Sequence, residues 1–532
     1  MTQMQRSPAL RVAALAAALL LAGCAVGPDY QRPDAPTSAA FKEASADMPA
    51  WAGAWKPAEP QDQVARADWW RVFNDPDLDT LMAQVRISNQ NIKAAEAQYR
   101  QAVGALRAAR AGFFPTLDGS ASASRSGSSN SSQAGNIRNG QSITFSANWE
   151  IDVWGRVRRQ VESSTASAQA SQADLAAALL STQSTLAQSY FLLRIADAQR
   201  ALLDRTVADY QRSLQLVQNQ YAVGTAQRSD VLQSETQLKS AQAQQIDIQI
   251  TRAQLEHAIA VLIGRSPSEL TLSAIDFDDA LPRVPVAVPS QLLERRPDIG
   301  AAERRMAAAN AEIGVAQAAY YPTLSLSATG GLTAATLARW LSLPDRIWSF
   351  GPSLAGAIFD GGLRSANKAQ AVAAYDQTVA NYRQTVLNAF QEVEDNLAAA
   401  RLLEQESVVQ NDALRSAREA LALVNNRYKA GTAALLDVLT AQTAAYTAER
   451  TALSITGRQY TTAVILIAAL GGGWHAGETD NGTAIASDTM GNTASATASA
   501  TASTTATATA TATATDTDTD TARATRGAAV KP

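Results

Sequence analysis

The longest features of the chain are two stretches whose hydrophobic residues recur at alternating spacings of three and four. In residues 157–222 the repeating positions include Leu203, Val207 and Tyr210, and residues 363–428 carry a similar set. This heptad-like spacing is typical of helices that pack lengthwise against a neighbour. Neither stretch contains Gly or Pro, so the pattern predicts two uninterrupted helices, each about 100 Å long.

Shorter helical patterns accompany each long one. After a glycine-containing turn, the chain returns through residues 229–263 in the first half and 436–470 in the second. Two further patterns, 80–111 and 291–318, precede the strand-like segments. Placed end to end, the two short helices of each half are about as long as one long helix. We therefore expect antiparallel helices that build the wall of a tube.

Between the helical patterns lie segments with the two-residue alternation of β-strands. From Ile143 to Val153 the odd-numbered residues are apolar and the even-numbered residues are polar, and a polar, Ser-rich stretch beginning at Phe114 precedes them. Such alternation gives a strand one apolar and one polar face. A soluble hairpin packed on a core would show the same pattern. The polar face and the long Ser/Gly/Asn loop favour a water-lined barrel, whose outer loops are long.

The second half contains a similar strand pattern that is interrupted once. Pro352 falls inside the run and weakens the prediction, because proline cannot donate to a neighbouring strand. The apolar set is Trp348, Phe350, Leu354 and Ile358, opposed by Ser349 and Ser353.

Landmarks of the first half recur in the second at one constant offset. Phe114-Pro115-Thr116-Leu117 returns as Tyr321-Pro322-Thr323-Leu324, an offset of 321 − 114 = 207. Asp230-Val231-Leu232 returns at the same offset as Asp437-Val438-Leu439. A constant offset between widely separated landmarks indicates duplication of a whole structural unit.

The domain organisation follows from these patterns and from composition. Residues 265–290 are proline-rich and read as a linker, and the Thr/Ala/Ser/Asp repeats near the C-terminus lack core-forming residues and are expected to be disordered. The predicted segments are a signal peptide 1–23, an anchor and extended segment 24–79, a first repeat 80–264, the linker, a second repeat 291–474 and a tail 475–532.

The N-terminus carries the features of an exported lipoprotein. Arg6 and Arg11 precede a short apolar run that ends in Leu-Ala-Gly-Cys. The cysteine of this motif, Cys24, is the single cysteine of the chain. The run is too short to span a bilayer as a stable helix. An ordinary secretory peptide with an incidental cysteine is the alternative. We interpret Cys24 as a lipidation site, and the absence of a second cysteine excludes a disulfide framework.

No later segment reads as a membrane helix, since the longest candidate, 463–470, is far too short. If the chain crosses a membrane, strands must do so. Four strands per chain are too few for a closed barrel. Several copies must therefore share one barrel, and the arithmetic allows two or three.

Composition gives no support for an enzyme or a nucleic-acid-binding protein. The net charge is −4, which provides no basic surface for nucleic acid. Of the two histidines, His257 lies in an apolar helix end and is expected to be packed, and His475 lies in the tail. The motifs of metalloproteases, serine hydrolases and phosphate-binding loops are absent. No cofactor is implied beyond a covalent lipid on Cys24.

Several motifs together resemble a known family. Cys24-Ala25-Val26-Gly27-Pro28-Asp29-Tyr30, Trp69-Trp70, Leu293-Glu294-Arg295-Arg296-Pro297 and Phe359-Asp360-Gly361-Gly362 are similar to the NodT-type lipoproteins, a branch of the TolC-like outer membrane factors. The resemblance implies a mixed α/β membrane protein built from a duplicated unit of long and short helices with four strands per chain. Three copies would form a twelve-stranded β-barrel continuous with a periplasmic α-helical barrel.

The resemblance also implies a function and partners. Such a homotrimer is a passive exit duct in the outer membrane that exports small molecules such as drugs. It docks on a periplasmic adaptor protein and an inner-membrane transporter of the resistance-nodulation-division (RND) class. Two alternatives remain. One is the duct of a type I protein-secretion system, and the other is a trimeric structural protein of the envelope. The duplication, with strands in both halves, argues against the second.

The family resemblance places a constriction at the second turn. Asp437 matches an acidic ring position and Leu436 an apolar ring position, whereas Asp230 and Tyr428 match residues that hold two helix pairs together in the closed state. Two positions depart from the pattern: Ala433 replaces an arginine, and Thr440 replaces a second ring acid. Both aspartates also stand near helix N-termini, where a capping role alone would explain them.

Overall fold

The computed structural model describes residues 26–34, 41–44, 68–127, 137–275, 296–334 and 346–472. By its internal contacts the chain divides into residues 1–478 and 479–532, and every described residue belongs to the first part. Cys24, the predicted disordered tail and the first residues of the predicted helix 291–318 lie outside the described residues.

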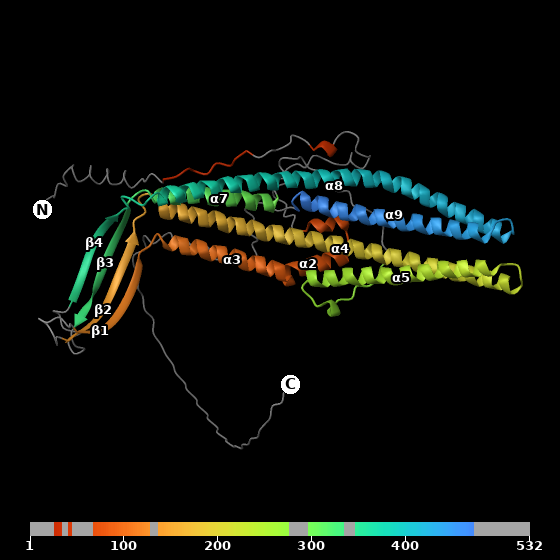
Figure 1. The fold of residues 1–532 in the computed structure, drawn as a ribbon, viewed down its shortest axis with the longest axis horizontal. Helices are drawn as coiled ribbons and strands as arrows, with labels where there is room; N and C mark the ends of the chain where they lie inside the picture. The colour runs from red at the N-terminus through yellow and green to blue at the C-terminus, as the bar shows by residue number, and fades with distance from the viewer. Residues whose placement is uncertain are drawn as a thin grey trace, which may run out of the picture. The chain divides into compact units, whose positions relative to one another are not determined.

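Two helices of 67 residues dominate the fold: α4 (Arg156–Ala222) and α8 (Leu363–Lys429). They agree with the predicted long helices to within one residue at each end. The returning helices α5 (Arg228–Leu262) and α9 (Leu435–Ala469) also agree to within one residue. Figure 1 shows α5 lying along one part of α4, and α9 along the corresponding part of α8.

Shorter helices continue the lines of α5 and α9. Helix α3 (Gln90–Ala111) packs on the remaining part of α4, and α7 (Pro297–Ala318) packs on both α4 and α8 (Figure 1). The expected end-to-end pairs are therefore present. Each joint is closed by a side chain that precedes the second helix: the Asn89 amide donates to the carbonyl of Leu262 at 2.7 Å, and the Arg296 guanidinium donates to that of Ala469 at 3.0 Å.

The predicted single helix 80–111 is wrong, because the chain forms two helices there. Helix α2 (Pro76–Ser88) begins early, since the Asp75 carboxylate accepts hydrogen bonds from the backbone amides of Asp77 and Leu78. It ends at Asn89, whose ψ of 127° is extended and whose side chain caps α3. The sequence there holds no helix breaker, and the reason for the break is tertiary: Asn89 also bonds the end of α5.

The predicted helix 291–318 begins at Pro297 among the described residues. Proline suits the first turn of a helix because its missing amide donor has no partner there in any case.

Four strands form one antiparallel sheet in the order β1-β2-β3-β4. β1 (Thr116–Gly127) and β2 (Ile137–Glu150) come from the first half, and β3 (Thr323–Ala334) and β4 (Arg346–Ala355) from the second. β2 pairs with β3 and so joins the halves, while β1 and β4 are the edges.

Both predicted strand ends needed correction. β2 stops at Glu150, although the alternation in the sequence continues to Val153, because the Asp152 carboxylate turns to accept the backbone amides of Val157 and Arg158 at the start of α4. β4 ends at Ala355, so Ile358 lies beyond the strand. Pro352 does not end β4, which is consistent with the tolerance of edge strands for proline.

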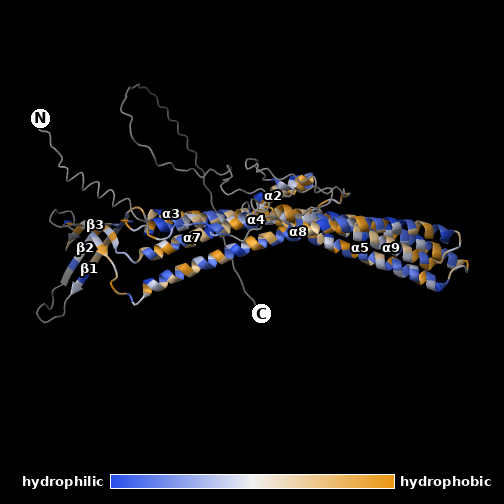
Figure 2. Ribbon diagram, turned by 90° about the horizontal axis from the view of Figure 1, so that it is seen from above, coloured by the Kyte–Doolittle hydropathy of each residue, from blue (hydrophilic) through white to orange (hydrophobic). Residues whose placement is uncertain are grey.

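The main apolar core lies midway along the helices, where a 3-10 turn, η3 (Trp69–Phe73), and α2 cover α4. Figure 2 shows hydrophobic residues gathered where α2 meets α4. The rings of Phe73, Phe191 and Tyr460 pack against one another in a cluster of three. Because this core brings α2, α4, α5 and α9 together, it holds the first and second repeats in place against each other.

The described part of the N-terminal segment lies along the helices. The Val26 amide donates to the carbonyl of Trp154, beside the sheet, and Arg159 bonds the Asp29 carboxylate at 2.8 Å. Burial, together with the nearby Glu303 carboxylate, raises the pKa of Tyr30 to about 12. Further on, Phe41 is buried against α8 and α9. This segment therefore follows α8 from the sheet toward the helix joint.

The duplication is visible element by element. α3 and α7, α4 and α8, α5 and α9, and β1 and β3 all begin and end at positions that differ by 207, as in 363 − 156 = 207. Of the described elements that pair in this way, β2 and β4 alone differ in their bounds. The structure therefore confirms the internal repeat predicted from sequence landmarks.

Candidate functional site

Two helical hairpins end side by side at the part of the chain farthest from the sheet (Figure 1). The first joins α4 to α5 and the second joins α8 to α9. Both turns use a glycine with positive φ, 79° at Gly224 and 74° at Gly431, a conformation that side chains other than glycine rarely adopt. Helix α9 packs against α4, so the hairpins contact each other.

The two aspartates predicted at the constriction form equivalent caps. The Asp230 carboxylate accepts the backbone amide of Gln227 at 3.0 Å, and the Asp437 carboxylate accepts that of Ala434 at 3.0 Å. Asp437 is exposed, whereas Asp230 is half-buried. The geometry therefore accounts for both residues as helix-start residues and leaves the Asp437 carboxylate accessible to solvent.

Leu436 and Thr440 occupy the same exposed side of α9. Leu436 is 56% exposed, although the neighbouring Leu435 and Leu439 are buried. The Thr440 hydroxyl donates to the carbonyl of Leu436 at 2.8 Å, so it is used within its own helix. Ala433 is half-buried and offers no charged group. Leu436 is thus an apolar side chain that its own chain leaves uncovered.

Tyr428 joins the hairpins through a residue that the sequence analysis did not identify. Its hydroxyl donates to the Gln220 side-chain carbonyl on α4 at 2.7 Å. The Asp230 carboxylate accepts the Gln227 amide at the start of α5 instead of this hydroxyl. The tyrosine also packs on the small core of Val217, Val231 and Leu435. Tyr428 and Asp230, which the family resemblance places at the contact between two helix pairs, are therefore not joined to each other through the Tyr428 hydroxyl.

More neutral hydrogen bonds connect the hairpins farther from the tips. They join Gln442 to Ser213 at 3.2 Å, Gln237 to Thr443 at 2.7 Å and Tyr446 to Gln244 at 2.8 Å. An ion pair follows, Arg205 to Glu449 at 3.1 Å. Amide and hydroxyl side chains carry no charge, so these bonds depend little on salt. The many glutamines of α4, α5 and α9 could have indicated that neutral hydrogen bonds join the helices. The sequence pattern alone did not show which helices they join.

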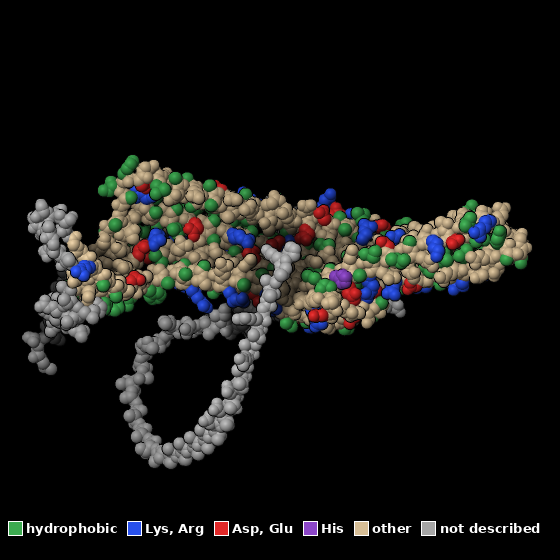
Figure 3. All heavy atoms as spheres, turned by 60° about the horizontal axis from the view of Figure 1, so that its bottom comes forward, with side chains coloured by type: hydrophobic (Ala, Val, Ile, Leu, Met, Phe, Trp, Pro, Cys, Tyr) green, Lys and Arg blue, Asp and Glu red, His purple; other side chains and the backbone are tan. Residues whose placement is uncertain are grey.

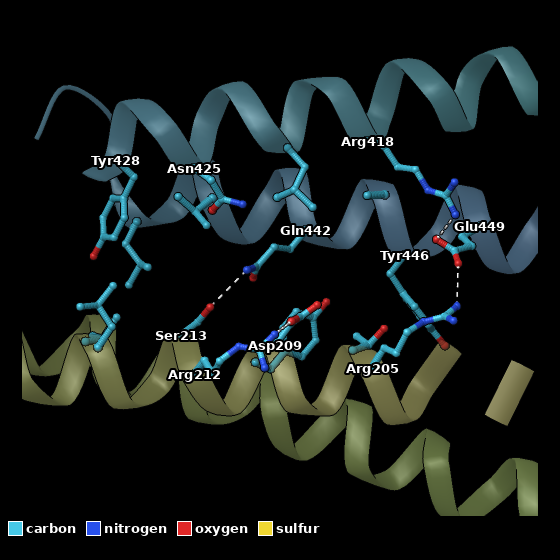
Figure 4. A pocket seen from close by; sticks show the side chains of 18 of the residues that line it. Arg205, Asp209, Arg212, Ser213, Arg418, Asn425, Tyr428, Gln442, Tyr446 and Glu449 are labelled. Atoms are coloured by element: carbon cyan, nitrogen blue, oxygen red, sulfur yellow. Dashed lines mark hydrogen bonds and ion pairs between the residues drawn. The ribbon is translucent and has the colours of Figure 1, made fainter. Parts of the chain in front are cut away.

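A groove of about 530 Å³ separates α4 from α8 near the tips, with α9 as its floor (Figure 4). At one end Glu449 bonds Arg205 across the groove and also Arg418 at 2.7 Å. Tyr428 lines the other end. On the face shown in Figure 3, basic, acidic and hydrophobic side chains alternate along the helices toward the tips. The groove therefore lies between the two hairpins and beside the predicted constriction.

The sheet has two chemically distinct faces. One face carries hydroxyl side chains in register, with Ser120 bonded to Thr144 at 2.7 Å and Ser122 to Ser142 at 2.8 Å. The other carries exposed hydrophobic side chains, among them Trp348 at 82% exposure and Phe350. A face of exposed aromatic and aliphatic side chains is expected where lipid or another chain covers it.

A cluster of ionisable side chains lies midway along the helices. Arg194 is 2% exposed, bonds Asp77 at 3.0 Å and the carbonyl of Ser273 at 2.7 Å, and lies over the Tyr190 ring. Burial, with the adjacent Asp75 carboxylate, raises the pKa of Tyr190, so its hydroxyl stays protonated and donates to Asp75. These bonds attach α2 and the segment after α5 to α4, so the cluster stabilises the fold.

Other candidates from the sequence add no chemistry. His257 is exposed on α5, so the prediction that it is packed is wrong. Within the described ranges, no three His, Cys, Asp or Glu residues are placed to hold a metal ion. Cys24 and His475 lie outside those ranges.

None of the described helices is both long and apolar enough to cross a membrane.

Known proteins are similar to this chain in sequence and in fold. The profile of the family described as outer membrane efflux protein matches residues 81–265 and 288–472. The probable efflux pump outer membrane protein TtgC of Pseudomonas putida is 31% identical over 86% of this chain and 94% of its own length. The cation efflux system protein CusC of Escherichia coli is 28% identical over 86% of this chain and 97% of its own length. The solved outer-membrane channel OprN has a TM-score of 0.77 and 32% identity, covering 85% of this chain and 100% of the OprN chain.

Proposed function

The chain belongs to the outer membrane efflux protein family, and from this premise we propose that it is the exit duct of a tripartite efflux pump. In this role it passes small molecules such as drugs across the outer membrane without catalysing a reaction. The observation that carries the proposal is the sheet with one hydroxyl face and one exposed apolar face, attached to helices that reach far from it. Water and solute would follow the first face and lipid the second.

Three copies would complete the duct. Within the described sheet, β1 and β4 each have a neighbour on one side only, and unpaired strand edges are not tolerated in lipid. Pairing β1 of one copy with β4 of the next would close a twelve-stranded barrel. Exposed apolar side chains on α5 and α8, such as Ile246, Ile250 and Val409, supply surface for the contacts between helices of neighbouring copies. The helices would then form the wall of a periplasmic tunnel.

The hairpin tips form the entrance in this proposal. Three Leu436 side chains would make an apolar ring, and three Asp437 carboxylates a negative ring beside it. An apolar constriction resists wetting, while converging carboxylates attract cations. The neutral bonds from Tyr428 and its neighbours would hold the entrance closed in place of the missing arginine at position 433. A periplasmic adaptor and an RND transporter are the partners expected to meet these tips.

A lipid on Cys24 would anchor the chain. Val26 is bonded beside the sheet at Trp154, and only one residue separates it from Cys24. Two residues of chain span at most about 7 Å, so a lipid anchor there would begin near the strands that we propose to face the membrane. Labelling with a palmitate analogue should mark the wild type and not Cys24→Ser, and labelling that survives the substitution would remove the anchor from the proposal.

The function is tested by dye accumulation in a strain that lacks this gene. We expect the deletion strain to accumulate an efflux dye, and the wild-type gene to restore export. The matched variants are Trp348→Asp, which places a charge on the apolar face, and Ser349→Asp, which places it on the hydroxyl face. We expect the first to abolish assembly and the second to preserve it. Export of a secreted protein, with unchanged dye accumulation, would instead identify a protein-secretion duct.

A further inference from the structure

The apolar face of the sheet carries two arginines, one on each edge strand. Arg125 follows Leu117 by eight residues in β1, and Arg346 precedes Trp348 by two in β4. An even spacing along a strand keeps side chains on one face, so both arginines share a face with the exposed Leu117, Trp348 and Phe350. Both are themselves exposed.

The two arginines lie at the end of the sheet away from the helices. β1 starts just after α3, and Arg125 is near its far end, whereas Arg346 is the first residue of β4, which then runs back toward α8. Eight residues separate Leu117 from Arg125 and also Leu354 from Arg346. For strands tilted as in membrane barrels, this spacing covers about 20 Å of depth. Both arginines therefore reach the outer boundary of the apolar band.

Neither guanidinium has a partner among the described residues. The acidic residues of the described strands, Asp118 and Glu150, belong to the hydroxyl face, and Glu150 is bonded to Arg156. The apolar face thus carries positive charge without a balancing acid in these strands. On a lipid-facing surface such charge costs most at the membrane midplane and little at the interface. Its position at the outer boundary fits an anionic partner supplied by the membrane.

We propose that Arg125 and Arg346 bind the phosphate groups of a phosphorylated glycolipid in the outer leaflet. The proposal rests on the proposed barrel, because β1 and β4 are the two edges of the sheet. Closing the barrel pairs these edges antiparallel and brings Arg125 of one copy and Arg346 of the next to the same end of one seam. Guanidinium groups bind phosphate through two parallel hydrogen bonds. The acyl chains of the same lipid cover Trp348 and Phe350.

Native mass spectrometry of the full chain in mild detergent tests this site. The probes are diphosphorylated lipid A and the same glycolipid after removal of both phosphates. The test variant is Arg125→Gln/Arg346→Gln, and the control is Arg107→Gln/Arg265→Gln, which removes the same charge from exposed helical and loop positions. We expect the test variant to bind the phosphorylated lipid about tenfold more weakly or worse. The control should bind like the wild type.

Each outcome decides the question. Equal binding by the test variant and the wild type, or equal binding of both lipids by the wild type, would overturn the site. Displacement of the lipid by an equal concentration of inorganic phosphate would also overturn it, because the occupant would then be free phosphate. A trimer that forms but retains no phosphorylated lipid contradicts this inference alone. A chain that never forms a trimer contradicts the proposed function and this inference together.

Discussion

Arg194 and Arg401 occupy the same position in the two copies of the repeat, since 401 − 194 = 207, yet their surroundings differ. Arg194 on α4 is 2% exposed and is held by Asp77 of α2. Arg401 on α8 is half-buried and pairs with Glu43 of the N-terminal segment at 2.6 Å. In both copies an arginine on the long helix fastens the segment that covers it. In the first copy that segment is a packed α-helix, and in the second it is a single 3-10 turn, Lys42–Ala44.

The helix joints show the same relationship. Asn89 and Arg296 are also 207 residues apart, and each donates to the last carbonyl of the preceding helix in its line. Asn89 is buried and also caps α3. Arg296 bonds Glu392 and Asp298, which are partly exposed to water. Both copies have the same backbone arrangement at the joint. The side chain that donates to the last helical carbonyl differs between them. Backbone geometry, more than residue identity, therefore survived the duplication.

The largest expected difference between the copies is the cost of losing these arginines. Arg194→Met leaves the buried Asp197 with Arg252 as its remaining cationic partner and removes the donor to the Ser273 carbonyl, so we expect a loss of about 3 kcal/mol. Arg401→Met breaks a pair that water reaches, and should cost about 1 kcal/mol or less. Thermal unfolding of the purified oligomer in detergent measures both. Equal losses would show that the two copies are fastened with equal strength.

The joints should differ less. Asn89→Ala removes a buried cap and the bond to Leu262, with an expected cost of about 2 kcal/mol. Arg296→Met should cost about 1 kcal/mol, because its acidic partners can be hydrated. Chemical denaturation of the same preparation gives both values, and Gln90→Ala, an exposed neighbour, serves as the control. A larger loss for Arg296→Met than for Asn89→Ala would reverse the assignment of the stronger joint.

The tips offer a sharper contrast in function. Ser229 and Leu436 are equivalent positions, since 436 − 229 = 207, and both are exposed. If the second copy forms the constriction, Leu436→Ser should raise basal conductance in planar bilayers several-fold, because the apolar barrier shrinks. Ser229→Leu should leave conductance unchanged. The opposite result, with an effect only at Ser229, would move the entrance to the first hairpin.

The smallest expected effect concerns the two caps. Asp230 and Asp437 are the third residues of their helices and accept the amide of the residue just before the helix. An asparagine side-chain oxygen can accept the same bond, so Asp230→Asn and Asp437→Asn should each cost less than about 1 kcal/mol. Only Asp437→Asn should lower the preference for cations over anions, since its carboxylate is the exposed one. Reversal potentials in a salt gradient provide the measurement. A similar drop in both variants would mean that both aspartates face the permeating ions.

The long helices were predictable because nothing in residues 157–222 or 363–428 opposes helix formation and the seam is periodic. The break at Asn89 was not, because an asparagine inside a helical pattern becomes a cap only when the end of α5 meets it. The strand end at Glu150 was missed for a similar reason: Asp152 continues the alternation in sequence, yet its carboxylate turns to cap α4.

The candidate site was predictable only in part. The positions of Asp230 and Asp437 after the turns followed from the repeat, and the structure shows the caps that such positions favour. The partner of Tyr428 could not be read from the sequence, because Gln220 lies 208 residues away on another helix. The roles of Leu436 and Asp437 at a constriction, and of Thr440 beside them, stay predictions until conductance is measured.

The covalent fusion of two copies has a consequence for symmetry. A ring of three such chains has six walls of similar backbone, yet neighbouring walls are encoded separately. A serine at one tip and a leucine at the next would therefore alternate around the opening, an arrangement that six identical single-repeat chains could not produce. Duplication lowers the symmetry from sixfold to threefold. Every second wall is then free to change without a matching change in the walls between them.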